Sequence, residues 1–290
     1  MSKRTRKASE SSANANPHSS TKRQKPSIPQ KTKRMGFLKQ PSDLAATYLL
    51  PSSTVIDFYP SFLTAEESAA LYNALTSAPH PPYSLISPIP TNTTFQWTTA
   101  SYKIFGKDIL APRLLSGFSD DQDVKDVYNI TSVFPWTPEV RKVKEKIERD
   151  LGITIRYAQA NWYRDGKDSI GFHTDSETRE GDCVVSLSLG VKRVFRLRHK
   201  RYKEVGDELI ESDDEDDEDG SGSRNGAGEV GDDSFSGLPI RKLTTTRVEF
   251  DLVPGSLLIM RGDCQKHWKH AVPKEKNVNE GRINITFREF

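Results

Sequence analysis

The sequence predicts a mainly β fold with flanking helices, an α+β arrangement built on a sandwich, barrel or jelly roll. The first observation is a series of short strand patterns in the second half of the chain, separated by Gly, Pro and Asp residues. The second is a pair of helix patterns that precede this series. The third is the length of 290 residues, which suits one large domain with tails.

The two helices begin at recognisable capping sequences. Residues 64–67, Thr-Ala-Glu-Glu, form a capping box that starts a helix through about Ser77. Thr137 caps the second helix, Pro138 occupies its first turn and Gly152 ends it. The apolar stripe of the second helix consists of Val140, Val143, Ile147 and Leu151. The second helix therefore offers one face to a core.

Six strands are expected after the second helix, and the last of them is the most informative. Their approximate ranges are 154–163, 183–190, 192–199, 246–253, 256–260 and 282–289. In the last strand Ile283, Ile285 and Phe287 form an apolar face, and Arg282, Asn284, Thr286 and Arg288 form a polar face. The polar face suits a bound dicarboxylate, because Arg can hold a carboxylate through two parallel hydrogen bonds. A solvent-facing edge strand with scattered polar residues is the alternative.

Charge is divided unevenly along this chain, whose net charge is +2. Residues 1–39 carry eleven Lys or Arg against one Glu, and we expect residues 1–40 to be a disordered basic tail. Residues 204–236 carry fourteen Asp or Glu against one Arg. We expect this stretch to be a disordered acidic insertion between two strands, since long loops add little closure entropy. The folded domain would then span residues 41–290.

Several protein classes are disfavoured by composition. Cys183 and Cys264 are the two cysteines, which argues against a disulfide framework. The sequence has no apolar run of ~18 residues for a membrane span, and no secretory signal at its start. The basic clusters at 3–7 and 22–25 are typical of a nuclear-localisation signal or a nucleic-acid-binding arm, with a solvated tail as the alternative. We expect a monomeric nuclear protein that does not associate with membranes.

A candidate metal site begins at residues 171–177, which read GFHTDSE. On a strand, His173 and Asp175 would face the same way. Either His267 or His270 could complete a set of two His and one carboxylate, the ligands of non-haem Fe(II) oxygenases. These two histidines face opposite ways in an extended segment, so only one is expected to bind. A lone His-x-Asp pair is more often a surface pair than a ligand set.

Four motifs that follow one another along the chain resemble those of a known family. They are Asn161-x-Tyr163, His173-x-Asp175, His270-x-x-Pro273 and Arg282-x-Asn284-x-Thr286-Phe287-Arg288. Together they resemble the AlkB family of Fe(II)/2-oxoglutarate-dependent nucleic-acid dioxygenases. The resemblance covers about residues 90–290, with the acidic insertion as its main departure, and leaves the basic tail unexplained. It implies that the core is a double-stranded β-helix, a form of jelly roll.

The resemblance also implies a role for each motif residue. Fe(II) would be bound by His173, Asp175 and His270, with His270 preferred to His267 because a Pro follows it three residues later. Arg282 would pair with the distal carboxylate of 2-oxoglutarate, and Arg288 would lie near the carboxylate that chelates the iron. The remaining contacts to 2-oxoglutarate would come from Asn161, Tyr163, Asn284 and Thr286.

Further stretches suggest contact with DNA. Residues 104–107 with Pro112 and Arg113 resemble the segment by which DNA-repair members of the family engage duplex DNA. Phe105 would fill the gap that a flipped base leaves, and its alternative is a core residue ahead of a turn. The expected substrate contacts are Phe105, Lys107, Arg113, Tyr128, Glu177 and Arg198.

The last three of these contacts have different expected partners. Glu177 would contact the edge of the flipped base, although a solvated Glu near Arg179 is the alternative. Tyr128 would line the base pocket. Arg198 belongs to a basic strand that would hold the nucleic-acid backbone through phosphate contacts, with an exposed strand as the plain alternative.

The expected function is oxidative demethylation of DNA bases such as 1-methyladenine and 3-methylcytosine. The reaction would use Fe(II), O2 and 2-oxoglutarate, and would release formaldehyde, succinate and CO2. One alternative is the same chemistry on RNA, and another is a non-catalytic nucleic-acid-binding module on the same fold. A 2-oxoglutarate hydroxylase of proteins or small molecules is a third alternative, which the basic core and tail disfavour.

Overall fold

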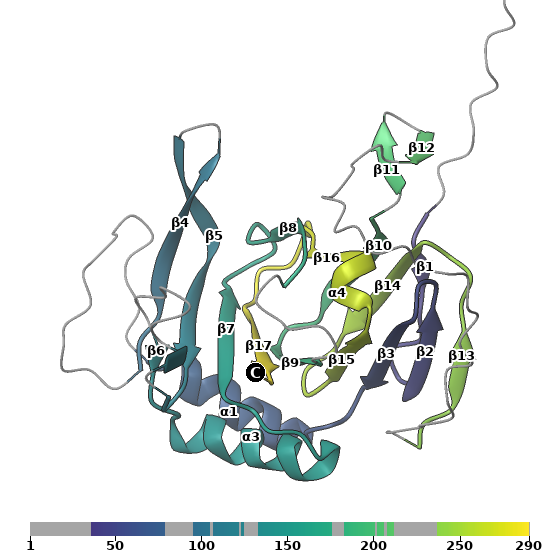
Figure 1. The fold of residues 1–290 in the computed structure, drawn as a ribbon. Coiled ribbons are helices and arrows are strands. Elements are labelled where there is room, and N and C mark those ends of the chain that lie inside the picture. Colours follow the sequence, from purple (N-terminus) through teal and green to yellow (C-terminus); the bar gives the residue numbers. More distant parts are fainter. Residues whose placement is uncertain are drawn as a thin grey trace, which may run out of the picture. The chain divides into compact units, whose positions relative to one another are not determined.

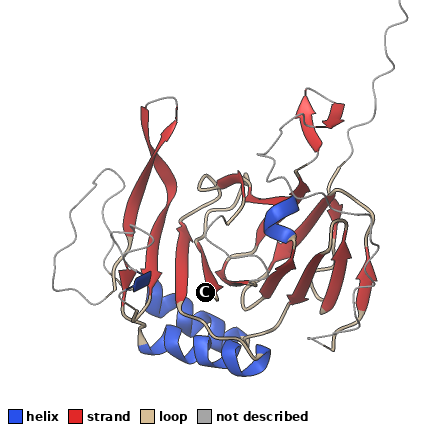
Figure 2. Ribbon diagram, in the orientation of Figure 1, coloured by secondary structure: helices blue, strands red, loops and turns tan. Residues whose placement is uncertain are grey.

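The computed structural model describes residues 36–78, 95–104, 107–121, 123–124, 133–175, 183–200, 202–205, 208–211 and 237–289. The chain divides into two units, Met1–Lys33 and Arg34–Phe290, and all described residues belong to the second. Within this unit two β-sheets pack face to face, and two helices cover the other face of the larger sheet (Figures 1 and 2). The expectation of a mainly β jelly-roll core with flanking helices is confirmed.

The larger sheet contains ten strands within the described residues. In spatial order they are β13 (Ile240–Lys242), β2 (Ala46–Leu50), β3 (Thr54–Tyr59), β15 (Leu257–Gly262), β9 (Val184–Gly190), β17 (Arg282–Arg288), β7 (Tyr157–Tyr163), β5 (Lys107–Phe118) and β4 (Thr98–Ile104), with β6 (Val133–Phe134) paired to β5. β17 lies between β9 and β7, and all its residues are buried. The alternative of a solvent-facing edge strand is therefore wrong.

The smaller sheet contains five strands. In spatial order they are β1 (Leu38–Lys39), β14 (Arg247–Leu252), β10 (Arg193–His199), β16 (Trp268–Val272) and β8 (Ile170–His173). A separate hairpin pairs β11 (Tyr202–Val205) with β12 (Glu208–Glu211), so the first residues of the expected acidic insertion are paired strand. Residues 212–236 and 1–35 lie outside the described residues.

Helices α1 (Ala65–Thr76) and α3 (Pro138–Leu151) begin where the capping sequences predict. The Thr64 hydroxyl accepts a hydrogen bond from the Glu67 backbone N–H at 3.2 Å, which completes the capping box. Gly152 ends α3 in the left-handed conformation, with φ of 67°. A third helix, α4 (Cys264–His267), connects β15 to β16. Among the described residues, no helix is both long enough and apolar enough to cross a bilayer.

Two apolar clusters hold these layers together. The first fills the space between the helices and the larger sheet, and β17 contributes Ile283, Ile285 and Phe287 to it. The second lies between the two sheets and includes Phe195 and Phe250. Because side chains alternate along a strand, the polar face of β17 points toward the smaller sheet. A polar cavity can therefore form beside an apolar core.

The six expected strands correspond to β7, β9, β10, β14, β15 and β17, with ends that differ by a few residues. Strands β2 to β5, which precede α3, were not expected, and neither were β8 and β16. β8 has only four residues, one of them a Gly, so the strand is too short for an alternating pattern to be visible in the sequence. It ends at His173, so Asp175 lies beyond the strand, and the condition that both residues belong to one strand is not met.

Candidate active site

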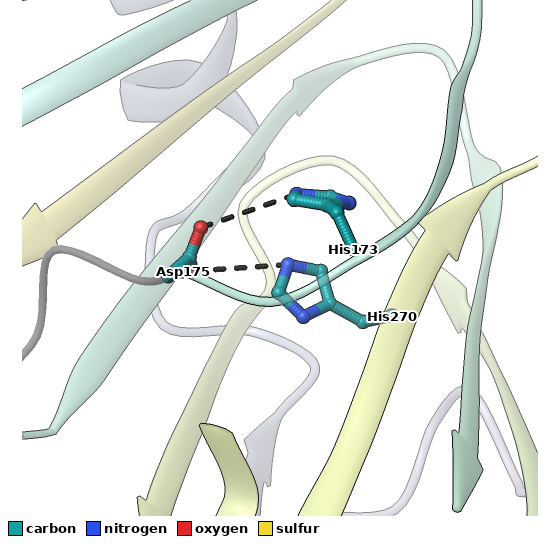
Figure 3. A group of neighbouring side chains, drawn as sticks. All are labelled: His173, Asp175 and His270. Carbon is teal, nitrogen blue, oxygen red and sulfur yellow. Dashed lines mark ion pairs between the residues drawn. The ribbon is translucent and has the colours of Figure 1, made fainter. Parts of the chain in front are cut away.

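The three expected metal ligands converge at one point between the sheets. β8 and β16 are antiparallel neighbours in which His173 lies opposite His270, and their ring centroids are 4.2 Å apart. Asp175 faces both rings, with Nε2 of His173 3.9 Å from Oδ1 and Nε2 of His270 3.7 Å from Oδ2 (Figure 3). Their ligand atoms all lie within 4.8 Å of one another. Two imidazoles and one carboxylate at this spacing fit a single Fe(II) ion and leave other coordination positions open.

Neighbouring groups orient two of these ligands. His173 Nδ1 lies 2.9 Å from the Gly171 carbonyl oxygen, so Nδ1 carries the hydrogen and Nε2 is left as the ligand atom. The Asp175 backbone N–H donates to Oε1 of Gln265 on α4 at 2.9 Å. Asp175 lies beyond the end of β8, so this bond replaces part of the support that strand pairing would provide.

Burial and nearby charges set the protonation of the site. Burial lowers the pKa of His270 to about 4, which leaves its imidazole neutral at pH 7. Burial alone would raise the pKa of Asp175, but interactions with His270, Arg288 and His173 outweigh it and hold the pKa below its usual value. Arg288 Nη2 donates directly to Asp175 Oδ1 at 3.1 Å. The neutral imidazole and the ionised carboxylate are the forms that bind a metal cation.

The other histidine considered for the site, His267, lies in a different environment. It is the last residue of α4, and its ring stacks on the ring of His199 with centroids 6.0 Å apart. His270 alone, on β16, joins the cluster with His173 and Asp175.

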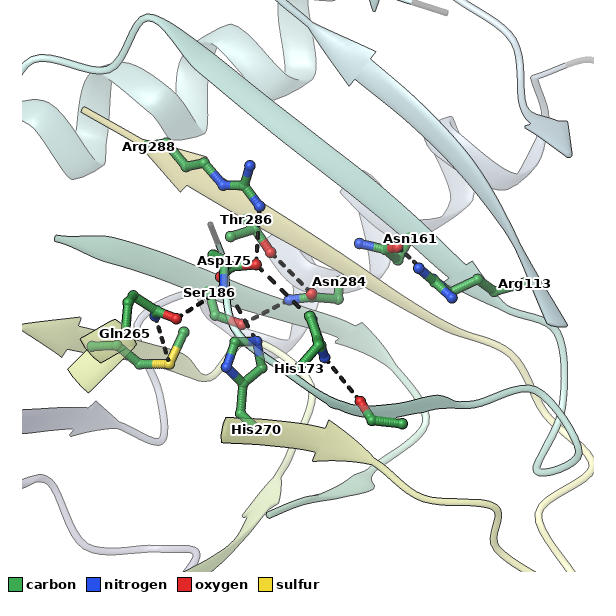
Figure 4. A network of polar contacts seen from close by, with 12 residues as sticks. Arg113, Asn161, His173, Asp175, Ser186, Gln265, His270, Asn284, Thr286 and Arg288 are labelled. Atoms are coloured by element: carbon green, nitrogen blue, oxygen red, sulfur yellow. Dashed lines mark hydrogen bonds and ion pairs between the residues drawn. The ribbon is translucent and has the colours of Figure 1, made fainter. Parts of the chain in front are cut away.

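A cavity of about 180 Å³ opens beside the three ligands. Its walls include the polar face of β17 together with Asn161 and Tyr163 of β7. A hydrogen-bond network fixes several of these side chains (Figure 4). Asn284 Nδ2 donates to Ser186 Oγ at 2.7 Å, and Thr286 donates to Asn284 Oδ1 at 3.1 Å. The structure thus brings together all nine residues expected to bind iron or 2-oxoglutarate.

Arg282 supplies the strongest local sign of an anion-binding site in this cavity. The residue is 1% exposed, and its Nη2 donates to Ser188 Oγ at 2.9 Å. Nε and Nη1 are also buried, without a hydrogen-bond partner among the described residues. Burial lowers the pKa of Arg282 to about 10, so the guanidinium remains charged at pH 7. A carboxylate would satisfy both the charge and the two N–H groups, as a bound 2-oxoglutarate requires.

The expected substrate contacts are only partly described. Phe105, Tyr128 and Glu177 lie outside the described residues, and Lys107 is described only as backbone in β5. Arg113 lines the cavity and donates through Nε to Asn161 Oδ1 at 2.8 Å. Arg198 on β10 lies with its guanidinium 4.4 Å from the centre of the Phe172 ring.

Several cavity residues were not anticipated from the sequence. They include Gln159 and Ser186, which line the cavity, Ser188, which binds Arg282, and Gln265, which binds Asp175. Alternation along β7 is a signal that could have identified Gln159, since it shares a strand face with Asn161 and Tyr163. Ser186 and Ser188 lie on β9, which carried no candidate, and they reach the site because β9 pairs with β17. Gln265 follows no such pattern, because its position depends on how α4 packs.

Comparisons with known proteins agree with this geometry. The profile of the 2OG-Fe(II) oxygenase superfamily matches residues 56–288. Alpha-ketoglutarate-dependent dioxygenase alkB homolog 3 of Rattus norvegicus is 34% identical over 155 residues, which cover 53% of this chain and 41% of that protein. DNA oxidative demethylase ALKBH2 of Bos taurus is 30% identical over 200 residues, which cover 68% of this chain and 59% of that protein.

The chain thus spans less than two thirds of the length of these relatives. Among solved structures, that of OsALKBH1 aligns with 81% of this chain and 96% of its own, at 15% identity and a TM-score of 0.41. The family profile covers most of the chain and includes the three ligands and Arg282. The chain therefore belongs to the 2OG-Fe(II) oxygenase superfamily, and to the AlkB family within it, with Fe(II) and 2-oxoglutarate as its cofactors.

Proposed function

We propose that this protein is an oxidative demethylase that removes N-linked methyl groups from bases in DNA. The observation that carries the proposal is the convergence of three ligand side chains with the buried, incompletely bonded guanidinium of Arg282 in one cavity. The relatives support the substrate class, since ALKBH2 of Bos taurus, to which the chain is similar, is named a DNA oxidative demethylase.

The side chains of the chain would divide the work as follows. His173, Asp175 and His270 would hold the iron, and the buried guanidinium of Arg282 would bind the distal carboxylate of 2-oxoglutarate. Arg288 would neutralise part of the negative charge near the iron while it orients Asp175. Arg113 would fix the amide of Asn161, so that its remaining hydrogen-bonding atoms face the 2-oxoglutarate.

When bound there, Fe(II) would supply the activation of O2 that accompanies the oxidative decarboxylation of 2-oxoglutarate. Across the net reaction, one oxygen atom of O2 would end in succinate, as 2-oxoglutarate loses CO2, and the other would end in formaldehyde. The N-linked methyl group would leave the base as that formaldehyde, and the unmodified base would be restored.

Two features support the nucleus as the compartment of this protein. The basic clusters at 3–7 and 22–25 are typical of nuclear-localisation signals, and a DNA demethylase needs access to the nucleus. We propose that the protein acts there as a monomer. The residues that would contact the nucleic acid are those expected from the sequence, namely Phe105, Lys107, Arg113, Tyr128, Glu177 and Arg198.

The test is release of succinate and formaldehyde from a panel of methylated oligonucleotides. Double-stranded DNA, single-stranded DNA and single-stranded RNA that carry 1-methyladenine or 3-methylcytosine should be compared, with and without Fe(II). We expect equal amounts of both products with methylated DNA, and loss of both in His173→Ala. Faster turnover of the RNA would assign the enzyme to RNA instead. Turnover of none of the nucleic acids by the iron-loaded protein would refute the proposal.

A further inference from the structure

The strand that carries His173 and leads to Asp175 lies at the edge of its sheet and has little support from the strands around it. β8 is four residues long and lies at the edge of the smaller sheet. Its pairing to β16 shifts register between the pair formed by His173 and His270 and the pair formed by Ile170 and Val272. An edge strand with irregular pairing is free to fray unless side chains from other elements hold it.

A second element reaches β8 from the opposite edge of the same sheet. β1 pairs with β14, and four strand spacings of about 4.8 Å separate β1 from β8 (Figure 1). Phe37 immediately precedes β1, yet its ring stacks on the ring of Phe172 in β8, with centroids 6.3 Å apart and planes inclined by 9°. The N-terminal end of the described chain therefore crosses the outer face of the smaller sheet.

Arginines of the intervening strands hold both rings in place. The guanidinium of Arg196 lies 4.8 Å from the centre of the Phe37 ring, and that of Arg247 lies 5.3 Å from it. The guanidinium of Arg198 lies 4.4 Å from the centre of the other ring, that of Phe172. Each contact is a cation–π interaction, which is stronger where water is partly excluded. We call Phe37, Phe172 and these three arginines the aromatic–arginine cluster.

The residues that follow Phe37 are anchored independently at β14. Gln40 donates its backbone N–H to the Glu249 carbonyl oxygen at 2.8 Å, and the Lys39 ammonium lies 2.7 Å from Asp251 Oδ2. These bonds fix residues 38–40, and so limit where the ring of Phe37 can lie. Phe37 and the residues after it therefore connect β14, which is paired on both sides, to the irregular edge strand β8.

We propose that Phe37 is a positioning residue for the iron site. It holds Phe172 on the outer face of the sheet, and because neighbouring residues on a strand point to opposite faces, this directs His173 to the inner face. The same contact restrains the end of β8 that leads to Asp175. The proposal concerns the metal site and does not depend on which methylated substrate the enzyme takes.

The test is Co(II) binding to the metal-free protein, followed by the visible spectrum of the bound ion without any nucleic acid. Loss of an aromatic stack in Phe37→Ala should weaken Co(II) binding about three- to tenfold, and Phe37→Tyr should restore it. Leu38→Ala is the matched control, because Leu38 is the next residue and its side chain is 47% exposed. It should bind Co(II) as the wild type does.

A double-mutant cycle separates this role from a general loss of stability. If Phe37 acts through Phe172, the double variant Phe37→Ala/Phe172→Ala should bind Co(II) no more weakly than Phe172→Ala alone. Hydrogen exchange should also rise at the amides of residues 170–175 in Phe37→Ala. Wild-type Co(II) affinity in Phe37→Ala, or fully additive effects in the cycle, would overturn the proposal. Either result leaves the demethylase assignment to its own substrate test.

Discussion

Burial and neighbouring charges together set the protonation states of His270 and Asp175. His270 is 6% exposed and has a pKa of about 4, so its Nε2 lone pair is available across the physiological range. Asp175 stays ionised because Arg288 donates a hydrogen bond to it and its neighbours lower its pKa. The neutral imidazole of His270 and the ionised carboxylate of Asp175 are the forms that bind a divalent cation.

The shifted pKa of His270 predicts how the stability of the metal-free protein depends on pH. An unfolded His has a pKa near 6.5, whereas folded His270 has a pKa of about 4. Between these values the unfolded chain binds the additional proton, so the free energy of unfolding must fall as the pH falls. We expect a loss of up to roughly 3 kcal/mol across this window and no contribution from this group above it.

Urea unfolding at a series of pH values, with a chelator present, measures this dependence. Burial also lowers the pKa of His267, which contributes with the same sign. The comparison should therefore be made between His267→Asn and the double variant His267→Asn/His270→Asn. The double variant should show a flatter profile between pH 6.5 and 4. If the two profiles have the same slope, the assigned protonation of His270 is incorrect.

Arg282 allows a prediction about the affinity for 2-oxoglutarate. A buried guanidinium that lacks partners for Nε and Nη1 among the described residues should gain most from a bound carboxylate. We expect Arg282→Met to raise the KM for 2-oxoglutarate about 10- to 100-fold, with a smaller effect on kcat. Arg282→Lys should give an intermediate KM, because it keeps the charge but loses the paired geometry. An unchanged KM in Arg282→Met would place the carboxylate elsewhere.

β17 shows how one strand serves both the core and the site. Its odd-numbered residues from 283 to 287 belong to the cluster under the helices, whereas its even-numbered residues line the cavity. The apolar face fixes the register of the strand, since a shift by one residue would place Arg282 and Arg288 in the apolar cluster. The position of the polar residues in the cavity therefore depends on the packing of the opposite face.

The short helix α4 supports one of the metal ligands through Gln265. Oε1 of Gln265 accepts a hydrogen bond from the Asp175 backbone N–H, and Nε2 of Gln265 donates to Met260 Sδ at 3.6 Å. Gln265→Leu should weaken Mn(II) binding about tenfold, measured by electron paramagnetic resonance, because the ligand carboxylate loses its support. Lys266→Ala is the control, since Lys266 is exposed on the same helix. Equal Mn(II) affinities of wild type and Gln265→Leu would show that Asp175 is held by other contacts.

Local signals in the sequence predict some elements and fail for others. The helices were predictable because Thr64, Thr137 and Gly152 act within their own turns. β17 was predictable because its alternation extends over seven residues. β8 and β16 could not be predicted, since both are short and are stabilised by pairing with each other across a long stretch of sequence. His173 and Asp175 would share a face if both lay on one strand, but Asp175 lies beyond β8, and nothing local marks where this strand ends.

The complete site exists only when the two sheets pack together. The iron ligands belong to β8, β16 and the residues after β8 in the smaller sheet, whereas Arg282 belongs to β17 in the larger sheet. The apolar cluster between the sheets, which includes Phe195 and Leu258, holds these two sets of side chains at a fixed separation. Iron binding and 2-oxoglutarate binding are therefore both expected to depend on the tertiary packing.

The residue types of the site were predictable from the sequence, but their arrangement was not. The motifs around Asn161, His173, His270 and Arg282 identify the residues that meet in the cavity. No local pattern places Arg113 against Asn161, because this contact joins neighbouring strands of the larger sheet. Likewise, Phe37 falls within residues 1–40, which were expected to be a disordered tail. Its contact with Phe172 arises only in the folded sheet, so the sequence gives no sign of it.

The central claim is that His173, Asp175 and His270 hold one iron beside an Arg282-bound keto diacid. The most direct measurement is an anaerobic titration with Fe(II) and 2-oxoglutarate, followed by the visible charge-transfer band that forms when a keto acid chelates ferrous iron. We predict one equivalent of iron per chain in the wild type, no band in His173→Ala, and a higher 2-oxoglutarate requirement in Arg282→Met. A band of wild-type intensity and stoichiometry in His173→Ala would contradict the account.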